Sequence, residues 1–113
     1  MSGERVLNAL VNLGLSETDS KVYIYLATHG PQEPRNIADT LKLKEELLRK
    51  ALENLKDKGI VTFALEQSTL FFALPFNAAL EVLMKAHLKE AQEMELSKGE
   101  ILSKWQKMMR GMP

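Results

Sequence analysis

The fold is decided by residues 34–59, which read PRNIADTLKLKEELLRKALENLKDKG. Two short stretches in it carry apolar residues three and four positions apart, the period of an amphipathic helix. These apolar positions are Ile37, Ala38 and Leu41, then Leu48, Ala51, Leu52 and Leu55. Pro34 suits a first helical turn, the period breaks at Lys42–Lys44, and the second stretch ends at Gly59. Two short helices joined by a turn of a few residues predict a helix-turn-helix.

Two further helices are predicted before this motif. The first spans residues 4–13 and ends at Gly14, and its expected inner face is Val6, Leu7, Leu10 and Val11. The second follows Ser16, whose hydroxyl can accept a hydrogen bond from a backbone amide of the first turn, and it ends at Gly30. We expect this helix to turn Val22, Tyr23, Leu26 and Ala27 inward.

The chain changes character after Gly59. Residues 60–66 and 69–74 are rich in β-branched, aromatic and aliphatic side chains, and Pro75 closes the second run. This pattern predicts a β-hairpin. Gln67 and Ser68 form a poor two-residue turn, so we expect the turn to be one or two residues longer.

A long helix is predicted from a cap at Asn77 to about Arg110, with a heptad pattern of apolar residues. Its stripe, diluted by Lys98, is Leu80, Met84, His87, Ala91, Met94, Ile101, Trp105 and Met108. A domain of this size cannot cover so long a stripe, so a second copy of the chain is the expected cover. Gly99 is the expected weak point, by a kink or a fold-back, because glycine costs about 1 kcal/mol in a helix interior.

The predicted fold is therefore mainly α with a small β-hairpin. It is a winged helix-turn-helix domain over residues 1–76, followed by a coiled-coil-like dimerisation helix over residues 77–113.

Composition excludes several classes of protein. The 113 residues are 45% hydrophobic and 27% charged with a net charge of zero, which disfavours a polycation that coats nucleic acid or membrane. The chain has no cysteine, no apolar run long enough to span a bilayer and no signal-peptide pattern, so we expect a cytoplasmic protein without a membrane partner.

Catalytic and metal sites are not expected. His29 and His87 lie outside metal-ligand spacings, and no phosphate-binding or nucleophile motif occurs. His29 suits the C-terminus of its helix, and Glu90, Glu93 and Glu95 fit an exposed helix face. We therefore expect no enzyme activity, no metal and no cofactor.

A DNA-binding surface is the expected use of the helix-turn-helix, since its second helix enters the major groove in this motif. Residues 35–58 hold seven Lys or Arg against five Asp or Glu, the most positive part of the chain. Arg49 and Lys50 can address guanine or phosphate, and Arg35 and Lys44 are placed for phosphate. The full candidate set is Arg35, Asn36, Lys44, Glu45, Arg49 and Lys50, with Gln67 and Ser68 at the hairpin turn.

The sequence also resembles a known family. Residues 13–23, LGLSETDSKVY, are similar to the opening of TrmB-like transcriptional regulators, and Gly30-Pro31, Ile37-Ala38 and residues 52–61 continue the pattern in order. The resemblance covers residues 7–83. It implies an archaeal or bacterial winged-helix protein that binds operator DNA as a dimer, through residues 44–58 and the hairpin 60–74. Larger members add a sugar-sensing domain, which we do not expect here because the chain ends at Pro113.

Three functions remain open at this stage. The first is a homodimeric DNA-binding regulator. The second is a winged helix that recognises an unidentified protein partner, suggested by the carboxylates of Glu45 and Glu46 and by apolar Phe71 and Phe72, where the family tends to carry cations. The third, an enzyme or metal sensor, would require turnover or a bound ion.

Overall fold

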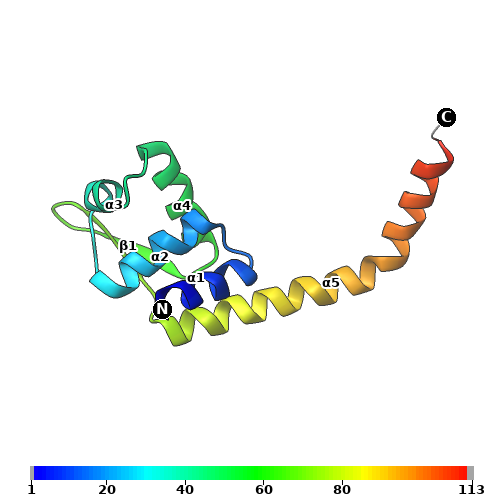
Figure 1. The fold of residues 1–113 in the computed structure, drawn as a ribbon, viewed down its shortest axis with the longest axis horizontal. Coiled ribbons are helices and arrows are strands. Elements are labelled where there is room, and N and C mark those ends of the chain that lie inside the picture. The colour runs from blue at the N-terminus through cyan, green and yellow to red at the C-terminus, as the bar shows by residue number, and fades with distance from the viewer. Residues whose placement is uncertain (1, 112–113) are drawn as a thin grey trace.

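The computed structural model describes residues 2–111 and contains five helices and one hairpin in them (Figure 1). In chain order the elements are α1 (Ser2–Asn12), α2 (Glu17–His29), α3 (Pro34–Leu41), α4 (Glu45–Asp57), β1 (Val61–Leu65), β2 (Thr69–Ala73) and α5 (Phe76–Arg110). The elements α1–α4, β1 and β2 form a compact head, and α5 projects from it, so the molecule measures 58 × 31 × 31 Å. The predicted fold class is confirmed.

One apolar core holds the head together. It takes at least one residue from every helix and from the start of β1. Its fully covered members are Leu10, Val22, Tyr23, Leu26, Ile37, Leu55, Ile60 and Ala79. Two expected core residues are corrected: Val11 is 41% exposed and Ala27 is exposed. Both lie at the edge of their helix's apolar face, where the neighbouring elements no longer reach.

The start of α2 is fixed by its cap. The Ser16 hydroxyl accepts a 3.0 Å hydrogen bond from the backbone N–H of Asp19, as predicted. The carboxylate of Asp19 accepts from the Asn54 side chain of α4 at 3.4 Å. Asp19 and Asn54 therefore tie the start of α2 to the last turns of α4.

The hairpin is longer at its turn than a two-residue loop. Strand β1 pairs antiparallel with β2 from Val61 opposite Ala73 to Leu65 opposite Thr69, which leaves residues 66–68 as the turn. The prediction of a longer turn is confirmed. Gln32 adds a third element, because its backbone N–H and carbonyl exchange two 2.9 Å hydrogen bonds with Phe71. The loop between α2 and α3 is thereby paired with β2.

Helix α5 begins earlier than its expected cap. The capping residue is Pro75, and Asn77 already lies inside the first turn, so the prediction of Asn77 as the cap is wrong. Proline suits this position because its fixed φ, here −54°, leads the chain from the strand into the helix. The helix continues through Gly99 to Arg110 without folding back, and it bends in its orange, second half (Figure 1).

Only the first turns of α5 belong to the core. Ala79 and Leu83 are buried and Leu80 is half-buried, whereas every residue from 84 to 111 is exposed except half-buried Ser97. None of the helices in residues 2–111 is long and apolar enough to cross a membrane.

Candidate nucleic-acid interface

Helix α4 has one buried and one solvent-facing side. Leu48, Ala51, Leu52 and Leu55 are buried in the core, so the spacing of 3.6 residues per turn directs the other side chains outward. Lys44, Glu45, Glu46, Arg49 and Lys50 are all exposed. The two cations on which the DNA-binding hypothesis depends are therefore open to solvent, and the chain's own fold does not cover them.

Arg49 is engaged by a neighbour on its own helix. Its Nη1 lies 3.4 Å from Oε1 of Glu53, one helical turn away, and the two side chains are 62% and 57% exposed. An exposed pair of this kind contributes little free energy, so the guanidinium can exchange this carboxylate for another acceptor. Within residues 2–111 the other ion pairs are Lys21–Glu17 and Lys104–Glu100, so Lys50 is in none of them.

The remaining candidate residues lie around α3 and the turn of the hairpin. Arg35 and Asn36 are exposed in the first turn of α3, and Gln67 and Ser68 are exposed at the turn. The Ser68 hydroxyl donates a 3.2 Å hydrogen bond to the carboxylate of Glu33, the residue before α3. Sequence reasoning missed Glu33, because the two residues lie 35 positions apart.

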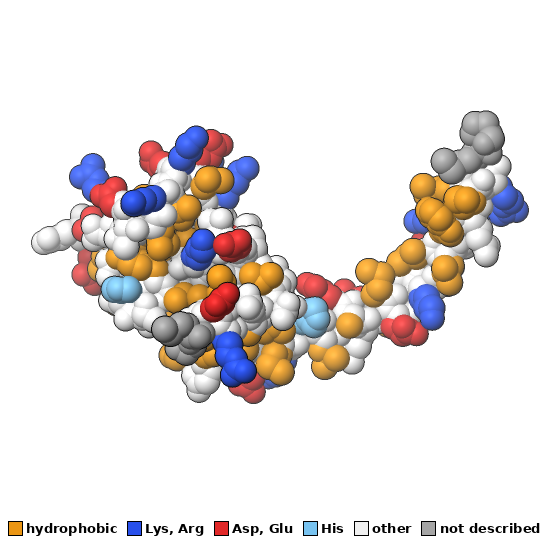
Figure 2. Space-filling model, viewed as in Figure 1, with side chains coloured by type: hydrophobic (Ala, Val, Ile, Leu, Met, Phe, Trp, Pro, Cys, Tyr) orange, Lys and Arg blue, Asp and Glu red, His pale blue; other side chains and the backbone are white. Residues whose placement is uncertain are grey.

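Charges of both signs share this end of the head. Figure 2 shows Lys and Arg side chains alternating with carboxylates over the α3–α4 end. The surface is therefore a set of separate cations rather than a continuous positive field, and its attraction for a polyanion is moderate.

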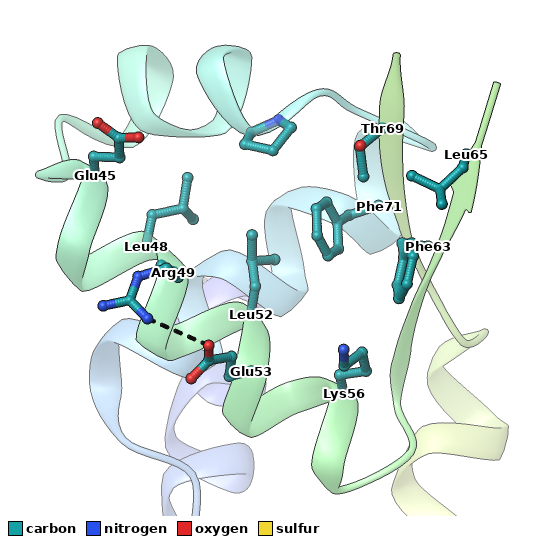
Figure 3. A pocket seen from close by; sticks show the side chains of 11 residues that line it. Glu45, Leu48, Arg49, Leu52, Glu53, Lys56, Phe63, Leu65, Thr69 and Phe71 are labelled. Atoms are coloured by element: carbon teal, nitrogen blue, oxygen red, sulfur yellow. Dashed lines mark hydrogen bonds and ion pairs between the residues drawn. The ribbon is translucent and has the colours of Figure 1, made fainter. Parts of the chain in front are cut away.

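A groove of about 420 Å³ lies between α4 and the hairpin (Figure 3). Apolar side chains from α4 and from both strands form its walls, and charged residues of α4 line its edge. The walls include Leu48, Leu52, Phe63, Leu65 and Phe71, and the charged edge is Glu45, Arg49, Glu53 and Lys56. Of the candidate residues, the groove brings together only Glu45 and Arg49.

Lys56 and Phe63 are the residues of this groove that sequence reasoning missed. The Lys56 ammonium lies 4.9 Å from the centre of the Phe63 ring, and the Phe63 and Phe71 rings are 5.7 Å apart. The signal was present: Lys56 follows Arg49 by seven residues and so shares its face of α4, and Phe63 lies opposite Phe71 in the hairpin.

Two titratable side chains outside this surface, those of Asp19 and His29, have structural rather than DNA-binding roles. Burial raises the pKa of Asp19, although hydrogen bonds from Asn54 and Ser16 oppose the shift. His29 lies in the last turn of α2, as expected, and its ring stacks on that of Tyr25 with the ring centres 4.4 Å apart. Among the described residues, no three His, Asp or Glu side chains lie close enough together to hold a metal ion.

Comparisons with solved structures show the same fold. TrmBL2, described as an archaeal chromatin protein, superposes with a TM-score of 0.74 at 17% identity, over 97% of this chain and 43% of that one. The ST1889 protein of Sulfolobus tokodaii gives 0.66 at 21% identity, over 87% and 99%. A MarR-family regulator of Silicibacter pomeroyi gives 0.57 at 16% identity, over 98% and 82%. The chain thus spans less than half the length of TrmBL2.

The sequence itself matches a family model. No curated protein matches it, but the model described as "Sugar-specific transcriptional regulator TrmB" matches residues 10–77. This range lies inside the resemblance predicted over residues 7–83 and contains α2, α3, α4 and the hairpin. Because the match covers more than half of its residues, the chain belongs to the TrmB family of transcriptional regulators.

Proposed function

We propose that this chain is a homodimeric transcription regulator that binds double-stranded DNA in the cytoplasm. Residues 1–76 serve as the DNA-binding unit and residues 77–113 as the dimerisation unit. The observation that carries the proposal is the outward placement of Arg49 and Lys50 on a helix whose opposite side is fixed in the core. Membership of a family of transcriptional regulators supports the same function.

In this proposal, α4 is the recognition helix and enters the major groove. Arg49 and Lys50 contact guanine edges or phosphates, and exposed Glu45 accepts a hydrogen bond from a cytosine amino group. Arg35, Asn36 and Lys44 contact phosphates beside the groove. The hairpin acts as the wing and touches the backbone with Gln67 and Ser68.

Helix α5 supplies the dimer interface. Its apolar stripe is uncovered in the single chain, with Met84 56%, Trp105 55% and Met108 63% exposed. Figure 2 shows hydrophobic side chains along the projecting part of this helix. Burying such a stripe against a second copy would remove it from water, and a dimer would present two recognition helices to two half-sites.

The test is binding of the purified protein to fluorescent duplexes from the DNA upstream of its own gene, titrated with salt. We expect binding that weakens with salt along a shallow log–log slope, because each neutralised phosphate contributes about −0.9 and few cations are available. The double variant R49E/K50E should abolish the binding. The matched control K85E/K89E makes the same change of charge on α5 and should leave it intact. Binding retained by R49E/K50E would reject α4 as the recognition helix.

A protein-binding module is the second candidate, favoured by the groove between α4 and the wing. Apolar walls edged by two carboxylates, Glu45 and Glu53, and by two cations, Arg49 and Lys56, suit an apolar peptide with charges of both signs at its flanks. Lack of binding to bulk genomic DNA at low salt, where non-specific binding is strongest, would favour this candidate over the regulator.

A further inference from the structure

The uncovered stripe of α5 is wider than its heptad core. With Met84, Ala91, Lys98 and Trp105 at the a positions, the residues at d are Leu80, His87, Met94, Ile101 and Met108. Three more apolar side chains, Leu88, Leu102 and Met109, occupy the neighbouring e positions, and they are 58%, 50% and 50% exposed. Any partner that covers this helix must therefore cover positions a, d and e together.

A parallel pair of these helices would oppose like charges. In a parallel dimer, equal positions meet at a and d, so Lys98 would face Lys98 of the partner subunit inside the seam. Position g of one helix faces position e of the next heptad, so Glu90 would face Glu95 of the partner subunit. Both contacts are repulsive, and two of the three apolar e positions, Leu102 and Met109, would face Ser97 and Lys104 of the partner subunit.

An antiparallel pair matches the same residues with complementary ones. In the register that sets Lys98 opposite Met94 of the partner subunit, its ammonium lies beside Glu95 of the partner subunit. Two such contacts, related by the two-fold axis, gather two cations and two carboxylates at the middle of the helix. The lysine in the seam is then paired rather than repelled.

Most flanking contacts of that register are also favourable. Antiparallel helices bring g against g and e against e, so Glu90 meets the partner's Lys104 and Leu88 meets the partner's Leu102. The same rule sets Glu95 against the partner's Glu95 at the axis, where the two Lys98 ammonium groups offset the repulsion, and it sets Met109 against the partner's Glu81. Lys104 already contacts Glu100 of its own helix at 3.5 Å, but that pair is more than 70% exposed and can be shared. At the a and d positions of this register, Met84 packs against the partner's Met108 and Trp105 packs against the partner's His87.

We propose that two copies of the chain pair antiparallel along α5, with the two-fold axis at Glu95–Lys98. This inference rests on the homodimer of the proposed function and adds its direction and register. The two heads lie at opposite ends of the paired helices, and the half-buried Ser97 faces the partner's Ser97 across the axis.

Cysteine cross-linking tests the direction, because the chain has no cysteine of its own. With a short bis-maleimide reagent, S97C alone should form a covalent dimer and M84C alone should not. A mixture of M84C and M108C should cross-link, and its yield should exceed that of either variant alone. Cross-linking of M84C with itself would show a parallel pair and overturn the proposal. Met84 and Met108 are exposed, so these changes leave the core of the head intact.

A charge change gives a second test, because E95K should weaken an antiparallel dimer and strengthen a parallel one. E95K leaves four cations at the axis of an antiparallel pair, so we expect the dimer dissociation constant to rise about tenfold at low salt. In a parallel pair, E95K would turn the Glu90 contact into an attractive one and tighten the dimer. E93K, at outward-facing position c, is the matched control and should have little effect. The double variant E95K/K98E exchanges the charges and should restore the affinity.

The outcomes also separate this proposal from the one on which it rests. A mass close to 12.8 kDa in sedimentation equilibrium at micromolar concentration is that of a monomer, and it would contradict both the homodimer and its register. If E95K leaves the dimer affinity unchanged or raises it, the antiparallel register alone would be contradicted. A protein that forms the dimer but does not bind DNA would contradict the proposed regulator function and would not affect the antiparallel register.

Discussion

The hydroxyl of Tyr23 donates a 2.6 Å hydrogen bond to the backbone carbonyl of Leu74, 51 residues further along the chain. Tyr23 is fully buried in α2, and Leu74 lies between β2 and α5. The Tyr23 side chain, in the middle of the head, thus fixes the backbone just before α5 projects from the head. The bond also satisfies a tyrosine hydroxyl that would otherwise be costly to bury.

Removing that hydroxyl should destabilise the head. We expect Tyr23→Phe to lower the free energy of unfolding by about 1–3 kcal/mol, because the Leu74 carbonyl loses its donor. Tyr25→Phe is the matched control, since its hydroxyl shares only an exposed 3.3 Å contact with Thr40 and should cost much less. Urea denaturation followed by circular dichroism gives both values, and equal losses in the two variants would contradict the role of the Leu74 bond.

Asp19 should make stability depend on pH in the acid range. Burial raises its pKa above the ordinary 3.8, so the folded protein holds this proton more tightly than the unfolded chain does. Its contribution is therefore fully present below about pH 3.8 and is lost as the pH rises through the folded-state pKa.

Asp19→Asn isolates this effect, because the amide does not titrate. The free energy of unfolding of the original protein, relative to the variant, should fall between pH 3 and pH 6, as measured by urea titrations at each pH. A relative stability that rises over this range would mean that the hydrogen bonds from Asn54 and Ser16 outweigh burial.

Reversing a carboxylate on the solvent side of α4 should strengthen DNA binding. Glu46 is exposed in the first turn, where its charge stabilises the helix but repels phosphate. We expect E46K to raise affinity for non-specific duplex DNA at low salt and to steepen the salt dependence by about one unit for an added phosphate contact. Fluorescence anisotropy measures both. E93K on α5 adds the same charge and should leave both unchanged if α4 is the contacting surface.

Gly99 is an unused position for stabilisation. Helix α5 passes through it unbroken, and a side-chain carbon added there would meet no atom within 4 Å. Gly99→Ala should therefore stabilise the helix by about 0.5–1 kcal/mol. Gly14→Ala should do the opposite, because Gly14 has a φ of +103°, which an alanine rarely adopts. Thermal melting of both variants, followed at 222 nm, tests the contrast.

What could be predicted from the sequence was local. The break at Lys42–Lys44, the cap at Ser16 and the apolar run at residues 69–74 each act on their own neighbours, and each appears where expected. Asn77 failed because a capping side chain predicts that a helix begins nearby but does not fix the residue. Pro75, two residues earlier, begins this one.

The relationships that were not predicted join distant parts of the chain. Asn54 to Asp19, Ser68 to Glu33 and Gln32 to Phe71 are separated by 35 residues or more, and periodicity carries no information at that range. Lys56 and Phe63 are only seven residues apart, but the groove that they share forms only when the hairpin packs beside α4. The expected site was therefore a set of exposed side chains, and the groove among them required the three-dimensional arrangement.

The pairing of Gln32 with Phe71 has a consequence for how target sites are chosen. A wing that is hydrogen-bonded to the loop before α3 is already ordered in the free protein, so little of its shape is left to adjust on contact. Because the protein surface is already rigid, the DNA duplex must change its shape for the two surfaces to fit. For the proposed homodimer, operators with easily deformed pyrimidine–purine steps between the two half-sites should then bind more tightly than rigid A-tracts with the same contacted bases.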